Sequence, residues 1–266
     1  MFGRRPESPA CGSTEPTQFH QRAVAMNLSK TLCAVVLSMA GIVSSAHAAI
    51  QIVGTRVVYP ATEREVTVRV MNVGTDPRLI QAWVDSGDDH ETAETSKAPF
   101  TINPPLSRID AGKGQSFRLM FTGAALPQDR ESVFWLNVVE VPTKPQEKES
   151  GQNFLQFAIR TRIKIFYRPS TLVGNPAGSV SQLTWKLARK DGKLAVTCTN
   201  GTAYNVSMGD IHLKGAAQRS SVEGGGMCPA KGSETFLVDG ADSGTVVYTT
   251  IDDYGTTAER ESPYTR

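Results

Sequence analysis

Histidine and cysteine are scarce in this chain, with 4 of each among 266 residues. No histidine or cysteine stands at metal-ligand spacing from another. The sequence also lacks a G-x-S-x-G nucleophile motif and a glycine-rich phosphate-binding loop. We therefore predict that the protein is not an enzyme and that it holds no metal or cofactor.

An excess of charge of either sign is also missing. The chain has 28 Lys and Arg against 26 Asp and Glu, a formal net charge of +2. No basic cluster is interleaved with aromatic residues that would stack on bases. We expect no nucleic-acid partner.

Long apolar runs are absent except for one near the N-terminus, from Leu32 to Val43. Lys30 precedes this run and Ala46-His47-Ala48 follows it, which is the pattern of a secretory signal peptide cleaved before Ala49. The run is too short to favour a membrane span. We expect a signal peptide over residues 26–48, with Met26 as the true start, and residues 1–25 as an extension outside the fold.

Export of the protein would determine which of the four cysteines remain in the mature chain. Cys11 and Cys33 fall in the segment that we expect to be absent from the exported protein. Cys198 and Cys228 then remain as one pair, and an oxidising compartment favours a disulfide between them. His90 and His212, the two remaining histidines, lie far apart in the sequence and do not favour the alternative, a metal site.

The rest of the chain alternates short strand-like segments with turn signals, which predicts an all-β protein with sandwich domains. A break at Arg168-Pro169-Ser170 favours a domain boundary, giving domains at 49–168 and 169–266. Asp191-Gly192 is a hairpin signal. We expect strands at Gln51–Tyr59, Glu65–Asn72, Ile80–Asp85, Ser116–Phe121, Ser132–Val141, Asn153–Tyr167, Leu183–Arg189, Lys193–Thr199, Asn205–Lys214, Ser233–Val238 and Thr245–Asp252.

The segment Asn153–Lys164 alternates most clearly. Leu155, Phe157 and Ile159 share one face of a strand, and the intervening positions are more polar. Periodicity alone favours a core strand with an apolar inner face and a solvated outer face.

Four segments resemble signature blocks of the periplasmic pilus-assembly chaperones, the PapD-like family. They are TRVVYP (55–60), LPQDRESVFWLNVVEVP (126–142), LQFAIRTRIKIFYRP (155–169) and IDDYG (251–255), in the family's order. The resemblance implies two immunoglobulin-like β-sandwich domains in an L-shaped arrangement. It also implies a periplasmic chaperone that binds pilus subunits by β-strand addition and delivers them to an outer-membrane usher.

The resemblance also assigns residues. Leu155, Phe157 and Ile159 match the positions that the family donates to its clients, the pilus subunits. Arg56 and Lys164 match two basic residues that anchor the client's C-terminal carboxylate.

A second set of residues matches structural features of the family. Glu131, Arg168 and Asp253 match a charged network between the domains. Asn103-Pro104-Pro105 resembles a turn in which the family has a cis peptide.

One alternative class remains, a generic two-domain β-sandwich adhesin or binding module. It explains the fold but not the presence of Arg56 together with Lys164. A long apolar strand edge also favours self-association, so a homodimer in which the free protein covers its own strand is a further expectation.

Overall fold

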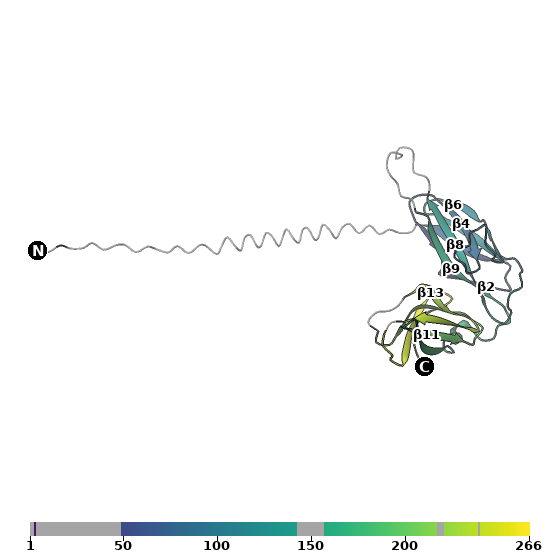
Figure 1. Ribbon diagram of the computed structural model, residues 1–266. Coiled ribbons are helices and arrows are strands. Elements are labelled where there is room, and N and C mark those ends of the chain that lie inside the picture. The colour runs from purple at the N-terminus through teal and green to yellow at the C-terminus, as the bar shows by residue number, and fades with distance from the viewer. Residues whose placement is uncertain (1–2, 4–48, 143–156, 217–220, 239) are drawn as a thin grey trace. The chain divides into compact units, whose positions relative to one another are not determined.

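The computed structural model describes residues 3, 49–142, 157–216, 221–238 and 240–266 (Figure 1). The chain divides into two compact units, Met1–His47 and Ala48–Arg266. Apart from Gly3, the predicted extension and signal peptide lie outside the described residues. The fold is therefore that of the second unit.

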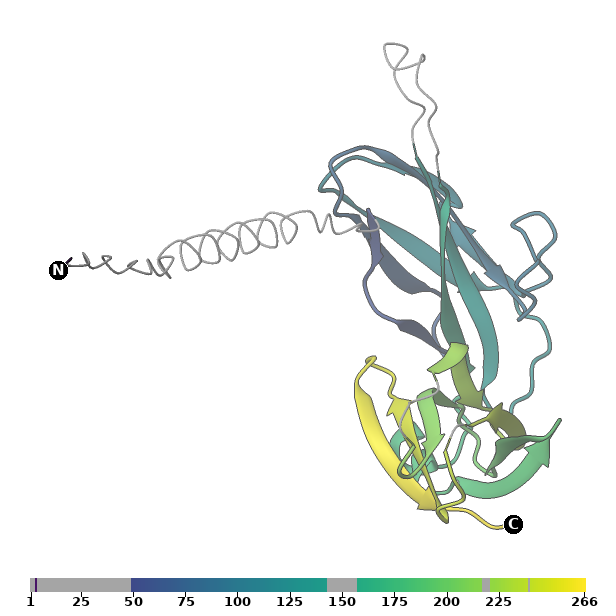
Figure 2. The ribbon, with the colours of Figure 1, turned by 60° about the vertical axis from the view of Figure 1, so that its left-hand side comes forward.

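Two sheets form the first sandwich of this unit. The four-stranded sheet has the order β1-β3-β7-β5 and the five-stranded sheet has the order β2-β9-β8-β4-β6. Figure 1 labels the strands of the five-stranded sheet, and Figure 2 shows the same ribbon turned by 60°. The pairing of β2 with β9 is parallel, and the other pairings of these described strands are antiparallel. The strands are β1 (Ile50–Ile52), β2 (Arg56–Pro60), β3 (Val66–Asn72), β4 (Arg78–Asp85), β5 (Phe100–Asn103), β6 (Leu106–Ile109), β7 (Gly114–Phe121), β8 (Ser132–Pro142) and β9 (Ile159–Arg168).

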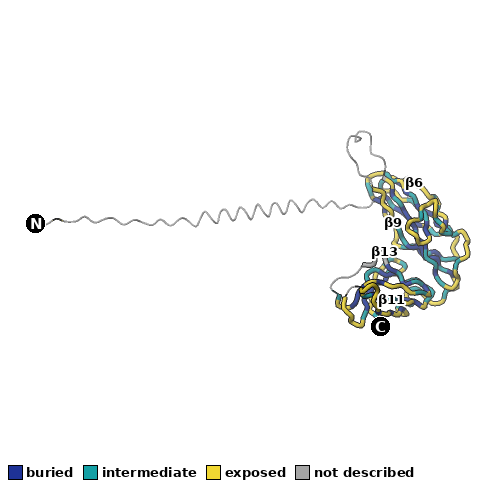
Figure 3. Tube along the Cα trace, in the orientation of Figure 1, coloured by how far each residue is buried: buried dark blue, intermediate teal, exposed yellow. Residues whose placement is uncertain are grey.

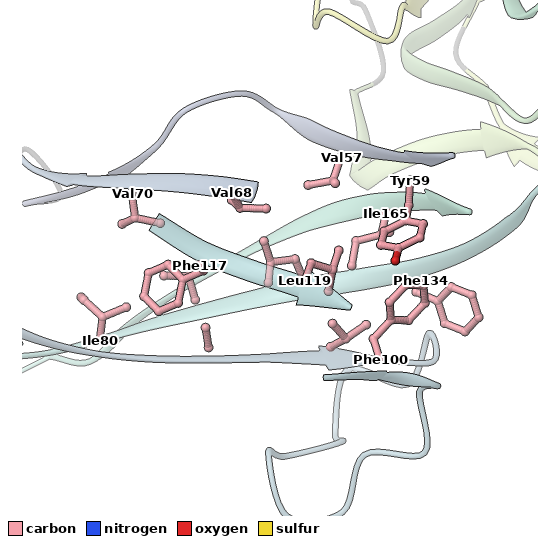
Figure 4. Packing of buried hydrophobic residues seen from close by; sticks show 14 of the residues in the cluster. Val57, Tyr59, Val68, Val70, Ile80, Phe100, Phe117, Leu119, Phe134 and Ile165 are labelled. Atoms are coloured by element: carbon pink, nitrogen blue, oxygen red, sulfur yellow. The ribbon is translucent and has the colours of Figure 1, made fainter. Parts of the chain in front are cut away.

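Alternating apolar side chains from both sheets meet between the layers of this sandwich. Val70, Ile80 and Ile165 have no exposed surface, and they come from β3, β4 and β9. Figure 4 shows these side chains with Phe117, Leu119 and others between the strands. In Figure 3 buried segments run through the strands, and exposed segments mark the turns.

A second sandwich follows, with sheets of the order β10-β11-β14 and β13-β12-β15-β16. Asp191 and Gly192 join β10 to β11 and both have positive φ, as the predicted hairpin turn requires. The elements are α2 (Pro176–Val180), β10 (Thr184–Lys190), β11 (Lys193–Asn200), β12 (Val206–Leu213), β13 (Ser221–Cys228), β14 (Gly232–Leu237), β15 (Thr245–Ile251) and β16 (Thr257–Pro263). Two immunoglobulin-like β-sandwich domains are thus confirmed.

The predicted strand Gln51–Tyr59 is divided in the structure. Its first part, β1, pairs with β3 in one sheet, and its second part, β2, pairs with β9 in the other. The chain crosses between the sheets at Gly54, whose φ of +107° is open to glycine at little cost. One continuous strand was the wrong prediction because a single alternating pattern does not reveal a change of sheet.

Four strands, β5, β6, β13 and β16, are absent from the prediction. All four lie at sheet edges. β5 and β6 flank the Asn103–Pro104 peptide, which is cis as in the family's turn. β5 and β6 are four residues long and stand on either side of Pro104-Pro105, and the sequence of β16 is largely polar, so none of these shows an alternation long enough to be predicted.

Candidate functional site

The parallel pairing of β2 with β9 places Arg56 directly opposite Lys164. Both side chains reach the second domain. Arg56 Nη1 donates a hydrogen bond to the carbonyl oxygen of Ile251 at 2.9 Å, and Lys164 Nζ donates to that of Gly226 at 3.0 Å. Two basic residues far apart in sequence are thus held side by side where the domains meet.

Burial makes these two charges costly. It lowers the pKa of Lys164 to about 8, with the positive charge of Arg56 as a second cause. Burial also lowers the pKa of Arg56, against the opposing charges of Asp253 and Asp252. A carboxylate placed between the two basic groups would relieve their repulsion and accept hydrogen bonds from both.

The apolar side chains on one face of β9 become more exposed toward the start of the strand. Ile165 has no exposed surface and Ile163 packs partly buried against the core. Ile159, at the first position of β9, is 42% exposed, and Phe157, which precedes the strand, is 68% exposed. Leu155 lies outside the described residues. Of the expected strand Asn153–Tyr167, residues 153–156 lie outside the described part of the chain, and β9 begins at Ile159, after Phe157 and Ala158.

One edge of β9 is open over the same residues. β8 pairs with Ile159–Tyr167, whereas β2 covers the other edge only from Lys164 to Arg168. Within the described residues, Ile159–Ile163 have no strand on the side of β2. Their main-chain groups on that side can accept a further strand.

The three charged residues predicted to form a network meet in the structure. Arg168 Nε donates to Glu131 Oε1 at 2.6 Å, and its Nη1 and Nη2 donate to Asp253 Oδ2 and Oδ1 at 2.9 and 3.2 Å. Glu131 Oε2 accepts hydrogen bonds from Asn205 N at 2.8 Å and Nδ2 at 3.2 Å. Burial raises the pKa of Glu131 against these bonds. Asn205 belongs to the network, and its sequence context carries no signal for that role.

A cavity of about 380 Å³ lies beside Arg56. Arg56 and Phe166 line it from the first domain. From the second domain come α2, the end of β15 and the turn that follows it, with Ile251, Asp253 and Tyr254 among its residues. Arg56 thus lies at the wall of a cavity, whereas Lys164 is not one of the residues that line it.

The predicted disulfide is present between Cys198 and Cys228, both fully buried, with an S–S distance of 2.06 Å. It joins β11 to β13 inside the second sandwich.

Asp88, Asp89 and His90 bring potential ligand atoms within 4.8 Å of one another, but all three are exposed and no ion binding follows from that.

Two family models match the chain. "Pili and flagellar-assembly chaperone, PapD N-terminal domain" matches residues 49–173, and "Pili assembly chaperone PapD, C-terminal domain" matches residues 179–262. The chain belongs to the PapD family of pilus assembly chaperones. It is thus a chaperone that acts in pilus assembly, and membership disfavours the alternative of a generic adhesin.

Named relatives agree with this assignment. The chaperone is 44% identical over 218 residues to the probable fimbrial chaperone YadV of Escherichia coli strain K12, covering 80% of this chain and 88% of that one. It is 40% identical over 221 residues to the chaperone protein FimB/FhaD of Bordetella pertussis, covering 82% and 88% of the two chains.

Solved structures also resemble it. The crystal structure of the YadV chaperone matches with a TM-score of 0.66 and 38% identity, over 81% of this chain and 100% of that one. The CupB2 chaperone of Pseudomonas aeruginosa matches with a TM-score of 0.65 and 35% identity, over 80% and 100%. These family models and relatives are described as chaperones. Among the described residues, no helix is long and apolar enough to cross a membrane.

Proposed function

We propose that the chaperone binds pilus subunits by adding β9 to a client that lacks a strand, and that Arg56 and Lys164 anchor the client's C-terminal carboxylate. The main observation behind this proposal is that β9 has an open edge and that exposed apolar side chains lie along the same part of the chain. Both cover the residues that precede Lys164.

The direction of the client strand follows from this geometry. The proposed anchor puts the carboxyl end of the client strand at Lys164, and β2 occupies the edge of β9 from there onward. The body of the client strand must then extend back along Ile163 to Ile159. A strand that ends at Lys164 and lies along the preceding residues runs parallel to β9.

Main-chain hydrogen bonds to the open edge supply affinity, and the apolar side chains fill pockets of the client. Phe157 and Ile159 together with Leu155 are the residues that we assign to this role. Burial of each such side chain contributes about 1.5–3 kcal/mol. The carboxylate anchor fixes the register, since a slip of one residue would turn the apolar side chains to the wrong face.

The compartment and the downstream partner are part of the proposal. We place the mature protein in the periplasm, after cleavage of the signal peptide at 26–48, and expect it to pass its clients to an outer-membrane usher. The similar structure of SfaE, described as a periplasmic chaperone, supports this location, with 29% identity and a TM-score of 0.61 over 82% of this chain. Arg168, Glu131 and Asp253 would hold the two domains in a fixed relation while this happens.

The free chaperone is expected to cover its exposed row by pairing with a second copy. Sedimentation at increasing protein concentration tests this. A shift to dimer that disappears when a client is bound supports it, whereas a monomer at all concentrations contradicts it.

The test of the proposed function is affinity purification of tagged variants from the periplasm, with mass spectrometry of the proteins recovered. R56A and K164A should recover pilus subunits with roughly 10- to 100-fold lower yield, because each removes a hydrogen bond to a charged group. R69A and K113A change exposed residues of the same types on β3 and before β7, and they should recover as much as the unaltered protein. If R56A and K164A recover as many pilus subunits as the unaltered protein, these residues do not anchor the client's carboxylate.

A further inference from the structure

Lys164 is not the only basic residue on its face of β9, because two arginines share that face. Arg160, Arg162 and Lys164 stand at every second position, about 6.6 Å apart along the strand. Under the proposed function this creates an ambiguity. A client strand displaced by two residues still presents its apolar side chains to the same face, so alternation does not exclude it. Its carboxylate would then lie beside Arg162 instead of Lys164.

The two arginines differ from Lys164 in their hydrogen-bond partners. Arg162 makes a two-bond ion pair with Asp85, with Nε to Oδ2 at 2.8 Å and Nη2 to Oδ1 at 2.6 Å. The Asp85 side chain has no exposed surface, and the Arg162 side chain is 23% exposed. Two of the three guanidinium nitrogens of Arg162, Nε and Nη2, are therefore already bound to a carboxylate, which also balances its positive charge.

Arg160 is engaged as well. Its Nε donates to Asn137 Oδ1 at 2.8 Å, its Nη1 donates to the carbonyl oxygen of Asp89 at 2.6 Å, and its Nη2 lies 3.6 Å from Asp85 Oδ2. Asn137 Nδ2 donates in turn to Asp85 Oδ2 at 2.7 Å. Asp85 is thus the shared centre for both arginines.

Two tryptophans hold the arginines against the sheet. The guanidinium of Arg160 lies 5.1 Å from the centre of the Trp83 ring, and that of Arg162 lies 4.2 Å from the Trp135 ring. At such distances a cation is attracted to the ring face. Lys164 Nζ also lies 5.3 Å from the centre of the Trp135 ring, so ion pairing with Asp85, rather than the aromatic contact, distinguishes the two arginines from Lys164.

Asp85 remains charged in this setting. Burial by itself would raise its pKa, but hydrogen bonds from Arg162, Asn137 and the Gly87 N–H outweigh burial and lower it. Asp85 can therefore neutralise the positive charge of Arg162, because it keeps its own negative charge.

We propose that Asp85 determines the register of client binding by occupying Arg162 and Arg160, so that the client carboxylate is accepted only at Arg56 and Lys164. This rests on the proposed function. It assigns a specificity role to a residue that does not touch the client.

The test uses a synthetic peptide of alternating valine and threonine with a free C-terminal carboxylate and a photoreactive benzoylphenylalanine beside it. After irradiation, tandem mass spectrometry locates the cross-link on the chaperone. The unaltered protein should cross-link around Arg56 and Lys164. D85N should add a second group of cross-links, displaced by two residues toward Arg162, of comparable yield. The double variant D85N/R162Q should restore the single position.

The outcomes separate the two proposals. If the unaltered protein gives no cross-link near Lys164, the proposed function fails and this inference with it. If it does, and folded D85N gives the same single position, Asp85 does not set the register. R162Q alone keeps the test decisive should D85N fail to fold. It should bind the peptide within about twofold of the unaltered protein, and a larger loss would show that Arg162 itself serves the client.

Discussion

The pKa of Lys164 makes client binding depend on pH in a defined direction. Burial and the charge of Arg56 lower this pKa to about 8 in the protein alone. A client carboxylate beside the ammonium raises it back toward the ordinary value of 10.5. Binding is therefore coupled to the uptake of a proton wherever the free protein has lost one, and the affinity falls as the pH rises above 8.

The size of the effect follows from the charged fraction of Lys164 in the free protein. That fraction is about nine-tenths at pH 7 and about one-tenth at pH 9, from a pKa of about 8. If only the charged form holds the carboxylate, the dissociation constant rises about tenfold between these pH values. Titration calorimetry with the synthetic peptide described above measures it.

Two controls isolate Lys164. K164R keeps its charge throughout this range and should bind the peptide with nearly constant affinity. A peptide with an amide in place of the carboxylate should bind more weakly and without this dependence on pH. Equal affinity of the acid peptide at both pH values, or the same decline for the amide peptide, would refute the reasoning.

The same shift has the opposite sign for the stability of the protein alone. Between about pH 8 and 10.5 the unfolded chain holds the Lys164 proton more tightly than the folded protein does. The contribution of this residue to the free energy of unfolding therefore rises with pH in that window, while client binding weakens.

Three further predictions concern the donated row, the charged network and the disulfide. I159E should abolish recovery of pilus subunits in the periplasmic purification without altering the thermal unfolding of the chaperone, since Ile159 is 42% exposed; normal recovery would remove it from the donated row. R168A should lower the free energy of unfolding in urea by about 3–5 kcal/mol, because it leaves buried Glu131 without its ionic partner and with only the hydrogen bonds from Asn205. D253N changes a more exposed carboxylate and should cost less than about 1 kcal/mol. Equal losses would contradict this ranking. Replacement of Cys198 and Cys228 by serine should cost about 2–4 kcal/mol in the same assay, and an unchanged midpoint would show that the pair does not stabilise the domain.

Much of the fold was visible in the sequence because buried strands impose a period of two. The inner face of β9 was predicted correctly, with Ile163 and Ile165 directed to the core. The pairing of Cys198 with Cys228 followed from export and from the lack of other partners. Edge strands such as β16 escaped because an exposed, charged sequence carries no such period.

The site was harder to predict from the residues themselves. Arg56 meets Lys164 only through a parallel register between strands far apart in sequence, which no local pattern encodes. The resemblance to a family supplied that pair. Asp85 had no such support, because it precedes a Ser-Gly turn and its local sequence indicates only the end of a strand. Its contacts with Asn137 and Arg162 come from β8, which pairs with β4, and from β9, one strand further away, so they depend on the sheet order.

Amide hydrogen exchange along β9 tests the central claim most directly. The chaperone is compared with and without the bound synthetic peptide, and the amides of β3, which lies between β1 and β7, serve as an internal reference. Addition of a client strand should slow exchange in Ile159–Ile163 and leave the reference unchanged. If exchange in Ile159–Ile163 stays as fast in the complex, β9 does not lend its edge to the client, and the account is wrong.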